Sequence, residues 1–413
     1  MTLRHFAAPL MLALPLLSGC HGDEPLNPPA SSTENNGLFL RYVSIGNSIA
    51  AGMQSAGIND STQQRTFPVL FARQVHTPFA YPRLAGRGCP APYTNNVTQT
   101  RVGNQPPSQP CDLRTVPAPD YINNLAVPGL GVRDAFSNTA SGLSTFSQLT
   151  TFLLGGRTQL QVLLADRPTF VSVEIGSNDI LGGLLADDNV GNIDSITPPA
   201  VFAAKYAELM DSVAGTGAKA VLFGIPDITV IPYASTGATY WCLKTGACPG
   251  VPAAAFPPTF TVSNNCAPAA AIPGAKGDST LVPWPIGLAK IKSALAGPVT
   301  LDCSADAEVV TPAEYAAARN ATDADNAVIQ QQAQAHGWAF VDANQLESGL
   351  RSTGGIPAFP DISGALAGQS VLFGPYITLD GLHPSTQLQR IIADSMISAV
   401  NRTYGTGMSF VGP

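Results

Sequence analysis

The feature that most constrains this chain is the alternation of short apolar runs with longer amphipathic stretches from residue 37 onward. The apolar runs have the length and composition of strands buried on both faces of a parallel sheet. They lie at residues 39–45, 121–127, 170–175, 220–225 and 339–342. Helical patterns lie between and after them, at residues 66–76, 158–167, 199–213, 312–336 and 385–404. This rhythm predicts an α/β fold, a three-layer α/β/α sandwich around a mainly parallel, five-stranded sheet.

Two segments interrupt the rhythm, at about residues 77–120 and 228–305. Both are rich in proline, and together they hold six cysteines. Loops longer than about 15 residues are usually functional or disordered. Because cysteines could staple these two segments, we interpret them as ordered, disulfide-bearing insertions in a single domain that spans residues 37–413. A further hypothesis is that the second insertion lines the substrate site, because it contains Trp241, Phe256, Phe260 and Trp284.

The chain has seven cysteines, an odd number that becomes even when Cys20 is set aside. Six cysteines allow 15 pairings. Proximity along the chain favours Cys89–Cys111, Cys242–Cys248 and Cys266–Cys303. No pair has the CxxC spacing of zinc modules and no histidine is grouped with them, so we expect neither a metal site nor a cofactor.

The first 20 residues have the pattern of an export signal. A basic start is followed by an apolar run that is too short to span a bilayer, which takes about 20 apolar residues. The run ends in LSGC, which resembles the lipobox of bacterial lipoproteins, in which the cysteine is lipidated after cleavage. The resemblance implies a lipid anchor on Cys20, with the polar residues 21–36 as a flexible tether. The residue after the cysteine is His21. An aspartate there would resemble an inner-membrane retention signal, so His21 favours the outer membrane. The alternative is an ordinary signal peptide in which Cys20 has no role.

Charge excludes one class of partner. Only 12% of the residues are charged and the net charge is −7, without any cluster of Lys and Arg. A nucleic-acid-binding protein needs a basic surface, so we do not expect nucleic acid to bind.

Polar or small residues follow three of the predicted strands. Ser48 follows the first, Gly129 the second and Asn178 the third, and ligands of open α/β sheets bind at these carboxyl ends. Near the end of the chain, Asp380 and His383 lie three residues apart in LDGLHPS. A carboxylate can fix the tautomer of such a histidine, which can then activate a serine. Taken singly, each residue has an ordinary alternative: Ser48 and Asn178 as helix caps, Gly129 as a turn residue and His383 as a loop residue.

Four blocks in this order resemble those of the SGNH hydrolases, the superfamily of GDSL-type esterases and lipases. The blocks are Ser48 in GNSIAAG, Gly129 in AVPG, Asn178 in GSND, and DGLH with Asp380 and His383. The resemblance implies a flavodoxin-like sheet and a serine-dependent carboxylic ester hydrolase. It makes Ser48, Asp380 and His383 the catalytic residues. The oxyanion hole would be formed by Ser48, Gly129 and Asn178.

The sequence departs from the family pattern at Asn47, where the family usually has aspartate before the serine. The tetrad GDST at residues 277–280 spells the family name more faithfully. It follows no predicted strand and comes after the asparagine block, so we interpret Ser279 as a decoy.

Three functions remain open at this stage. The first is hydrolysis of a lipid or small acyl ester. The second uses the same site for acyl transfer or for deacetylation of a polysaccharide. The third is an inactive surface lipoprotein that only binds its ligand, against which the intact Asp380 and His383 argue.

Overall fold

A computed structural model describes residues 37–105, 121–137, 153–185, 190–250, 254 and 256–412. Its centre is a parallel sheet of four strands in the order β1-β4-β5-β10. Nearly every residue of these strands is buried, which confirms the prediction of strands covered on both faces. The strands are β1 (Tyr42–Gly46), β4 (Phe170–Glu174), β5 (Lys219–Phe223) and β10 (Ala339–Val341).

The predicted second strand, residues 121–127, is not a strand of the sheet. It runs beside β1 and makes one isolated parallel bridge, between Ser44 and Asn124. The amides of Asn123 and Asn124 donate to the backbone oxygens of Tyr42 and Ala50. Such bonds between side chain and backbone compete with a regular ladder. The sheet therefore has four strands, and this segment takes the place of the fifth.

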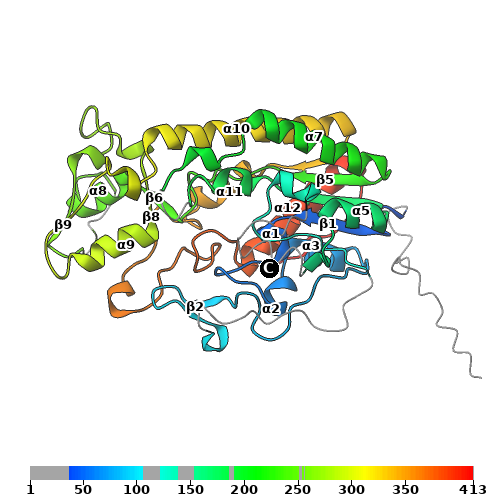
Figure 1. The fold of residues 1–413 in the computed structure, drawn as a ribbon, viewed down its shortest axis with the longest axis horizontal. Helices are drawn as coiled ribbons and strands as arrows, with labels where there is room; N and C mark the ends of the chain where they lie inside the picture. The colour runs from blue at the N-terminus through cyan, green and yellow to red at the C-terminus, as the bar shows by residue number, and fades with distance from the viewer. Residues whose placement is uncertain are drawn as a thin grey trace, which may run out of the picture.

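Helices cover both faces of the sheet, as Figure 1 shows. On one face lie α3 (Phe67–Gln74) and α12 (Thr386–Tyr404), and on the other α5 (Gln159–Asp166), α7 (Pro199–Gly215) and α10 (Pro312–His336). The predicted bounds agree with these to within a few residues because the helices have clear ends. In α10, Thr311 and Glu314 form a capping box, and Gly337 ends the helix in the left-handed conformation.

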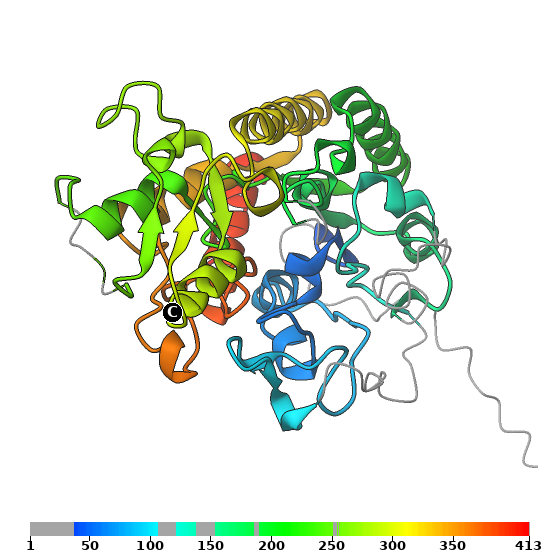
Figure 2. The same ribbon diagram turned by 60° about the vertical axis from the view of Figure 1, so that its left-hand side comes forward.

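The second insertion folds around a small core of its own (Figure 2). Trp241, Phe256 and Phe260 belong to that core. Its elements are β6 (Ala234–Thr236) paired with β8 (Leu281–Pro283), β7 (Phe260–Val262) paired with β9 (Val299–Leu301), and the helices α8 (Gly237–Thr245) and α9 (Trp284–Ser293).

Disulfides staple this insertion as predicted. Cys242 bonds to Cys248 and Cys266 bonds to Cys303. Cys89 in the first insertion is also disulfide-bonded. Its predicted partner Cys111 lies outside the described residues, as do Cys20, the signal segment and the tether. Within the described part of the chain, no helix is both long and apolar enough to cross a membrane.

The remaining elements are short. The first insertion contains the hairpin β2 (Tyr93–Asn95) and β3 (Thr100–Arg101). The other helices are α1 (Ser48–Ala51), α2 (Asp60–Gln63), α6 (Ser177–Leu181) and α11 (Ala343–Ser352). Single 3₁₀ turns are η2 (Val102–Asn104), η3 (Val132–Phe136), η4 (Ile193–Ser195), η5 (Asn264–Cys266), η6 (Gly277–Ser279), η7 (Asp306–Glu308) and η8 (Ala365–Ala367).

Candidate active site

Ser48 is the first residue of α1, at the carboxyl end of β1, but it does not cap this helix. The cap is Asn47, whose side-chain oxygen accepts the N–H of Ile49 at 3.0 Å. The hydroxyl of Ser48 is thereby left for another partner. The interpretation of Ser48 as a helix cap is wrong.

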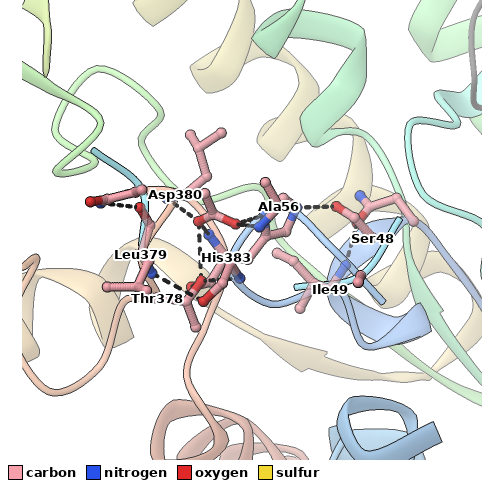
Figure 3. A network of polar contacts seen from close by, with 12 residues as sticks. Ser48, Ile49, Ala56, Thr378, Leu379, Asp380 and His383 are labelled. Atoms are coloured by element: carbon pink, nitrogen blue, oxygen red, sulfur yellow. Dashed lines mark hydrogen bonds and ion pairs between the residues drawn. The ribbon is translucent and has the colours of Figure 1, made fainter. Parts of the chain in front are cut away.

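That partner is His383, in the loop before α12 (Figure 3). Its Nε2 lies 2.9 Å from the Oγ of Ser48, and its Nδ1 lies 2.8 Å from Oδ2 of Asp380. The three side chains are close to solvent but largely covered, with relative exposures of 8% for Ser48 and 7% for Asp380. This is the geometry in which a histidine can take the proton of a serine hydroxyl while a carboxylate orients the ring. The structure thus brings together all three residues predicted to be catalytic.

The carboxylate of Asp380 is held by several donors besides His383. Backbone N–H groups of Leu382, His383 and Ala56 donate to it, and so does the hydroxyl of Thr378. Burial alone would raise the pKa of Asp380. The charge of His383 and these hydrogen bonds outweigh burial and lower the pKa to about 2. Asp380 is therefore ionised throughout the physiological range.

Two of the predicted oxyanion residues, Gly129 in a loop and Asn178 in α6, lie on segments that contact each other. Gly129 adopts a left-handed φ of 82°, which suits glycine. The side-chain amide of Asn178 donates to the carbonyl of Leu130, the next residue, at 3.0 Å. An amide nitrogen carries two N–H groups, so this bond orients the amide and leaves one N–H for an oxyanion. Asn178 does not cap α6, because the cap position is Gly176.

The N–H of Ser48 completes this set of donors. It makes no hydrogen bond to any of the residues that the structure describes, whereas the N–H groups of the next two residues are both used. The structure places Ser48 and Asn178 at the carboxyl ends of the neighbouring strands β1 and β4. Gly129 follows the segment that runs beside β1. Their joint role as an oxyanion hole stays a prediction.

Asp179 is a residue of this site that was not predicted to belong to it. Its carboxylate accepts the N–H of Val132 at 2.8 Å and thus ties the Gly129 loop to α6. A Cβ on Gly131 would lie 2.9 Å from its oxygens, so any larger residue there would displace this carboxylate. Burial raises the pKa of Asp179 to about 6, against the hydrogen bond from Val132. The repeated glycine in PGLG was the only signal in the sequence.

Glu174, the last residue of β4, was also missed. Its Oε2 accepts the N–H of Ala50 at 3.2 Å, inside the helix that carries Ser48. Burial raises the pKa of Glu174 to about 8, although hydrogen bonds from Ala50 and Asn47 oppose the shift. A single charged residue at the end of the buried run FVSVE was the available signal.

An apolar cavity of about 110 Å³ adjoins the catalytic residues. Ile49, next to Ser48, and Leu382 and Pro384, on either side of His383, form part of its wall. The rest of the wall comes mainly from the ends of β5 and β10 and from α11 and α12. From the second insertion Ile231 is part of the wall, whereas Trp241, Phe256, Phe260 and Trp284 are not. The hypothesis that this insertion lines the acyl site stays a prediction.

Two other kinds of site were considered from the sequence, a second nucleophilic serine and a metal site. Ser279 is in η6, and its hydroxyl donates to the carbonyl of Lys276, as expected for a decoy. Among the residues with described positions, no group of three or more His, Cys, Asp or Glu side chains could hold a metal ion.

Comparison with known proteins gives matches only among solved structures. No protein-family profile and no curated protein matches the chain. One matching structure is an extracellular lipase from Streptomyces rimosus, with 14% identity, a TM-score of 0.37, and coverage of 87% of this chain and 98% of that one. Another is an acetyl xylan esterase from Geobacillus stearothermophilus, with 12% identity, a TM-score of 0.36, and coverage of 89% and 95%.

A third match is a putative GDSL-like lipase from Parabacteroides merdae. It has 12% identity, a TM-score of 0.33, and coverage of 91% of this chain and 99% of that one. These proteins are esterases and lipases, the class of enzyme that the four sequence blocks resemble. At such identities and TM-scores the matches carry no argument about activity, which has to come from the site.

Proposed function

We propose that this protein is a serine-dependent carboxylic ester hydrolase. The observation that supports this most directly is the chain of contacts from Ser48 Oγ to His383 Nε2 and from His383 Nδ1 to Asp380, at 2.9 and 2.8 Å. A serine hydroxyl is a weak nucleophile without such a base, and a histidine needs an orienting group to serve as one.

The reaction follows from these contacts. Ser48 Oγ attacks the ester carbonyl while its proton moves to Nε2 of His383, and Asp380 stabilises the imidazolium. The N–H groups of Ser48, Gly129 and Asn178 bind the oxyanion. The alcohol leaves with the proton from His383, and an acyl-enzyme on Ser48 remains. Water, deprotonated by His383, then releases the acid and restores the serine.

The apolar cavity supports an aliphatic acyl group as the substrate's acid part. Apolar cavities of about 150 Å³ bind benzene. The cavity of about 110 Å³ beside Ser48 therefore suits a chain of several carbons. An acetyl group would leave most of it empty. This favours ester hydrolysis on short or medium acyl chains over the alternative of polysaccharide deacetylation.

The test is turnover of p-nitrophenyl butyrate by wild type, Ser48→Ala and Ser279→Ala proteins. Product release should disappear in Ser48→Ala and persist in Ser279→Ala, because the second serine lies outside the site. Activity retained by folded Ser48→Ala would contradict the proposal. Adding an alcohol acceptor separates the remaining alternative: acyl transfer would give a new ester in place of the free acid.

We also propose that the enzyme is exported and anchored by lipid at Cys20.

 The support is the LSGC stretch and the even number of cysteines that remain in the exported chain. Mass spectrometry of the protein purified from membranes of an expressing bacterium tests this anchor. A diacylated or triacylated N-terminal Cys20 is the expected result. An N-terminus at any other residue would contradict the anchor and leave the esterase proposal intact.

A further inference from the structure

A buried carboxyl group lies directly beneath the helix that carries the nucleophile. Glu174 ends β4 in register with Gly46, the last residue of β1. Its Oε2 accepts the N–H of Ala50 at 3.2 Å. A Cβ on Gly46 would lie 2.9 Å from the carbonyl oxygen of Glu174 and 3.3 Å from Oε2. The end of β1 and the first turn of α1 are thus packed closely against this one side chain.

Asn47 contacts both Glu174 and the first turn of α1. Its N–H donates to the carbonyl of Glu174 at 3.1 Å, and its Oδ1 accepts the N–H of Ile49. The side chain is 1% exposed, and Nδ2 makes no hydrogen bond of ordinary geometry within the described part of the chain. Asn47 is thus buried against Glu174 through this backbone contact.

The helix α1 needs such support because it has only four residues. A helix of this length is not stable alone. Two of its first N–H groups are held by side chains, that of Ile49 by Asn47 and that of Ala50 by Glu174. These two bonds fix the direction of the remaining N–H, that of Ser48, which the proposed mechanism uses in the oxyanion hole.

We propose that Glu174 is a positioning residue that holds the Ser48 turn in its reactive geometry, and that Asn47 is its matched partner. The inference rests on the proposed function. In the usual family pattern an aspartate would stand at position 47 and bring a second carboxyl group against Glu174. Two carboxyl groups buried together cannot both ionise without a large cost. The amide of Asn47 keeps the helix cap and avoids this second titrating group.

The experiment measures kcat and KM with p-nitrophenyl acetate for Glu174→Ala and Glu174→Gln. Acetate is chosen because Glu174 also lines the apolar cavity, which an acetyl group does not fill. Loss of one oxyanion donor costs about 10²- to 10³-fold in rate. Misplacing one donor should cost less, so we expect kcat to fall about 10- to 100-fold in Glu174→Ala with little change in KM. Glu174→Gln keeps an accepting oxygen and should recover most of the loss.

The control is Asp166→Asn on α5. It makes the same carboxyl-to-amide change at another group whose pKa is raised by burial, at the end of α5 just before β4. Thermal unfolding of each variant shows whether it folds. A folded Glu174→Ala with kcat within twofold of wild type would overturn the positioning role. Glu174→Gln as slow as Glu174→Ala would overturn the role of the accepting oxygen.

The partner role is tested by the pH profile of kcat in Asn47→Asp. Two facing carboxyl groups should share one proton, and loss of this proton should add an alkaline decline that wild type lacks. The decline should vanish in Asn47→Asp/Glu174→Gln. Glu347 across the cavity and His383 beside it are the other titratable groups nearby, and both are unchanged in every variant. An unaltered profile in Asn47→Asp would overturn the pairing.

These outcomes are separable from the proposed function. Hydrolysis by wild type and its loss in Ser48→Ala test the esterase itself. If wild type does not hydrolyse the ester, the proposed function fails. If it does and the Glu174 variants match it, only the positioning role fails.

Discussion

The apolar cavity predicts that longer acyl chains react faster than acetate. Filling the cavity should reverse this preference for longer chains. Ala343, the first residue of α11, lies in its wall. Ala343→Leu adds three carbons to the space that an acyl chain would occupy. Each buried methylene contributes about 0.8 kcal/mol, which is about fourfold in kcat/KM. Three displaced methylenes therefore amount to about 2.4 kcal/mol.

The measured quantity is the ratio of kcat/KM for p-nitrophenyl hexanoate to that for the acetate. In Ala343→Leu this ratio should fall by up to about 60-fold, as 1.36 kcal/mol corresponds to a factor of ten. The acetate rate should change little, because an acetyl group occupies little of the cavity. Ala200→Leu on the exposed surface of α7 is the matched control. An unchanged ratio in folded Ala343→Leu would refute the assignment of the cavity as the acyl site.

Three further predictions concern the triad and stability. Asp380→Asn should lower kcat by about 10⁴-fold, as for the same change in serine proteases, with the fold retained by circular dichroism; a loss under tenfold would contradict its role. Burial, and then the charge of Asp179, raises the pKa of Asp325 from 3.8 to about 8. The folded protein thus keeps a proton that the unfolded chain releases, and stability falls as pH rises through this range. In Asp325→Asn the drop in Tm between pH 5 and pH 8 should be smaller than in wild type, and an equal drop would contradict this. Removing the Cys266–Cys303 disulfide, whose sequence separation is 37, should lower the free energy of unfolding in urea by about 4 kcal/mol. Removing Cys242–Cys248, with a separation of 6, should lower it by about 2 kcal/mol. Equal losses would exclude the chain-entropy explanation.

Much of the sheet and its helices could be predicted because local pattern and burial agree. The run FVSVE reads as a strand buried on both faces, and β4 is such a strand. The segment at residues 121–127 reads the same way by composition, but its two asparagine side chains bond to the backbone of β1 at Tyr42 and of α1 at Ala50, and the segment makes no regular ladder. Composition does not show where a side-chain amide will find its partner.

The triad could be predicted because each block has recognisable neighbours in sequence. The supporting residues could not, because their partners are far away in the chain. Glu174 bonds to a residue 124 positions away, and Asp179 to one 47 positions away. Most residues of the cavity wall were missed for a related reason. Trp241, Phe256 and Phe260 of the second insertion pack in a core of their own, whereas the helix α11, which was not predicted, lines the cavity.

The most direct test of the account is labelling of the folded, disulfide-intact protein with a fluorophosphonate, followed by mass spectrometry of the modified peptide. Such probes react with a serine that a neighbouring base activates. The account predicts one adduct, on Ser48, which is lost in Ser48→Ala and retained in Ser279→Ala. No adduct on Ser48, or an adduct on Ser279, would contradict the assignment of the active site.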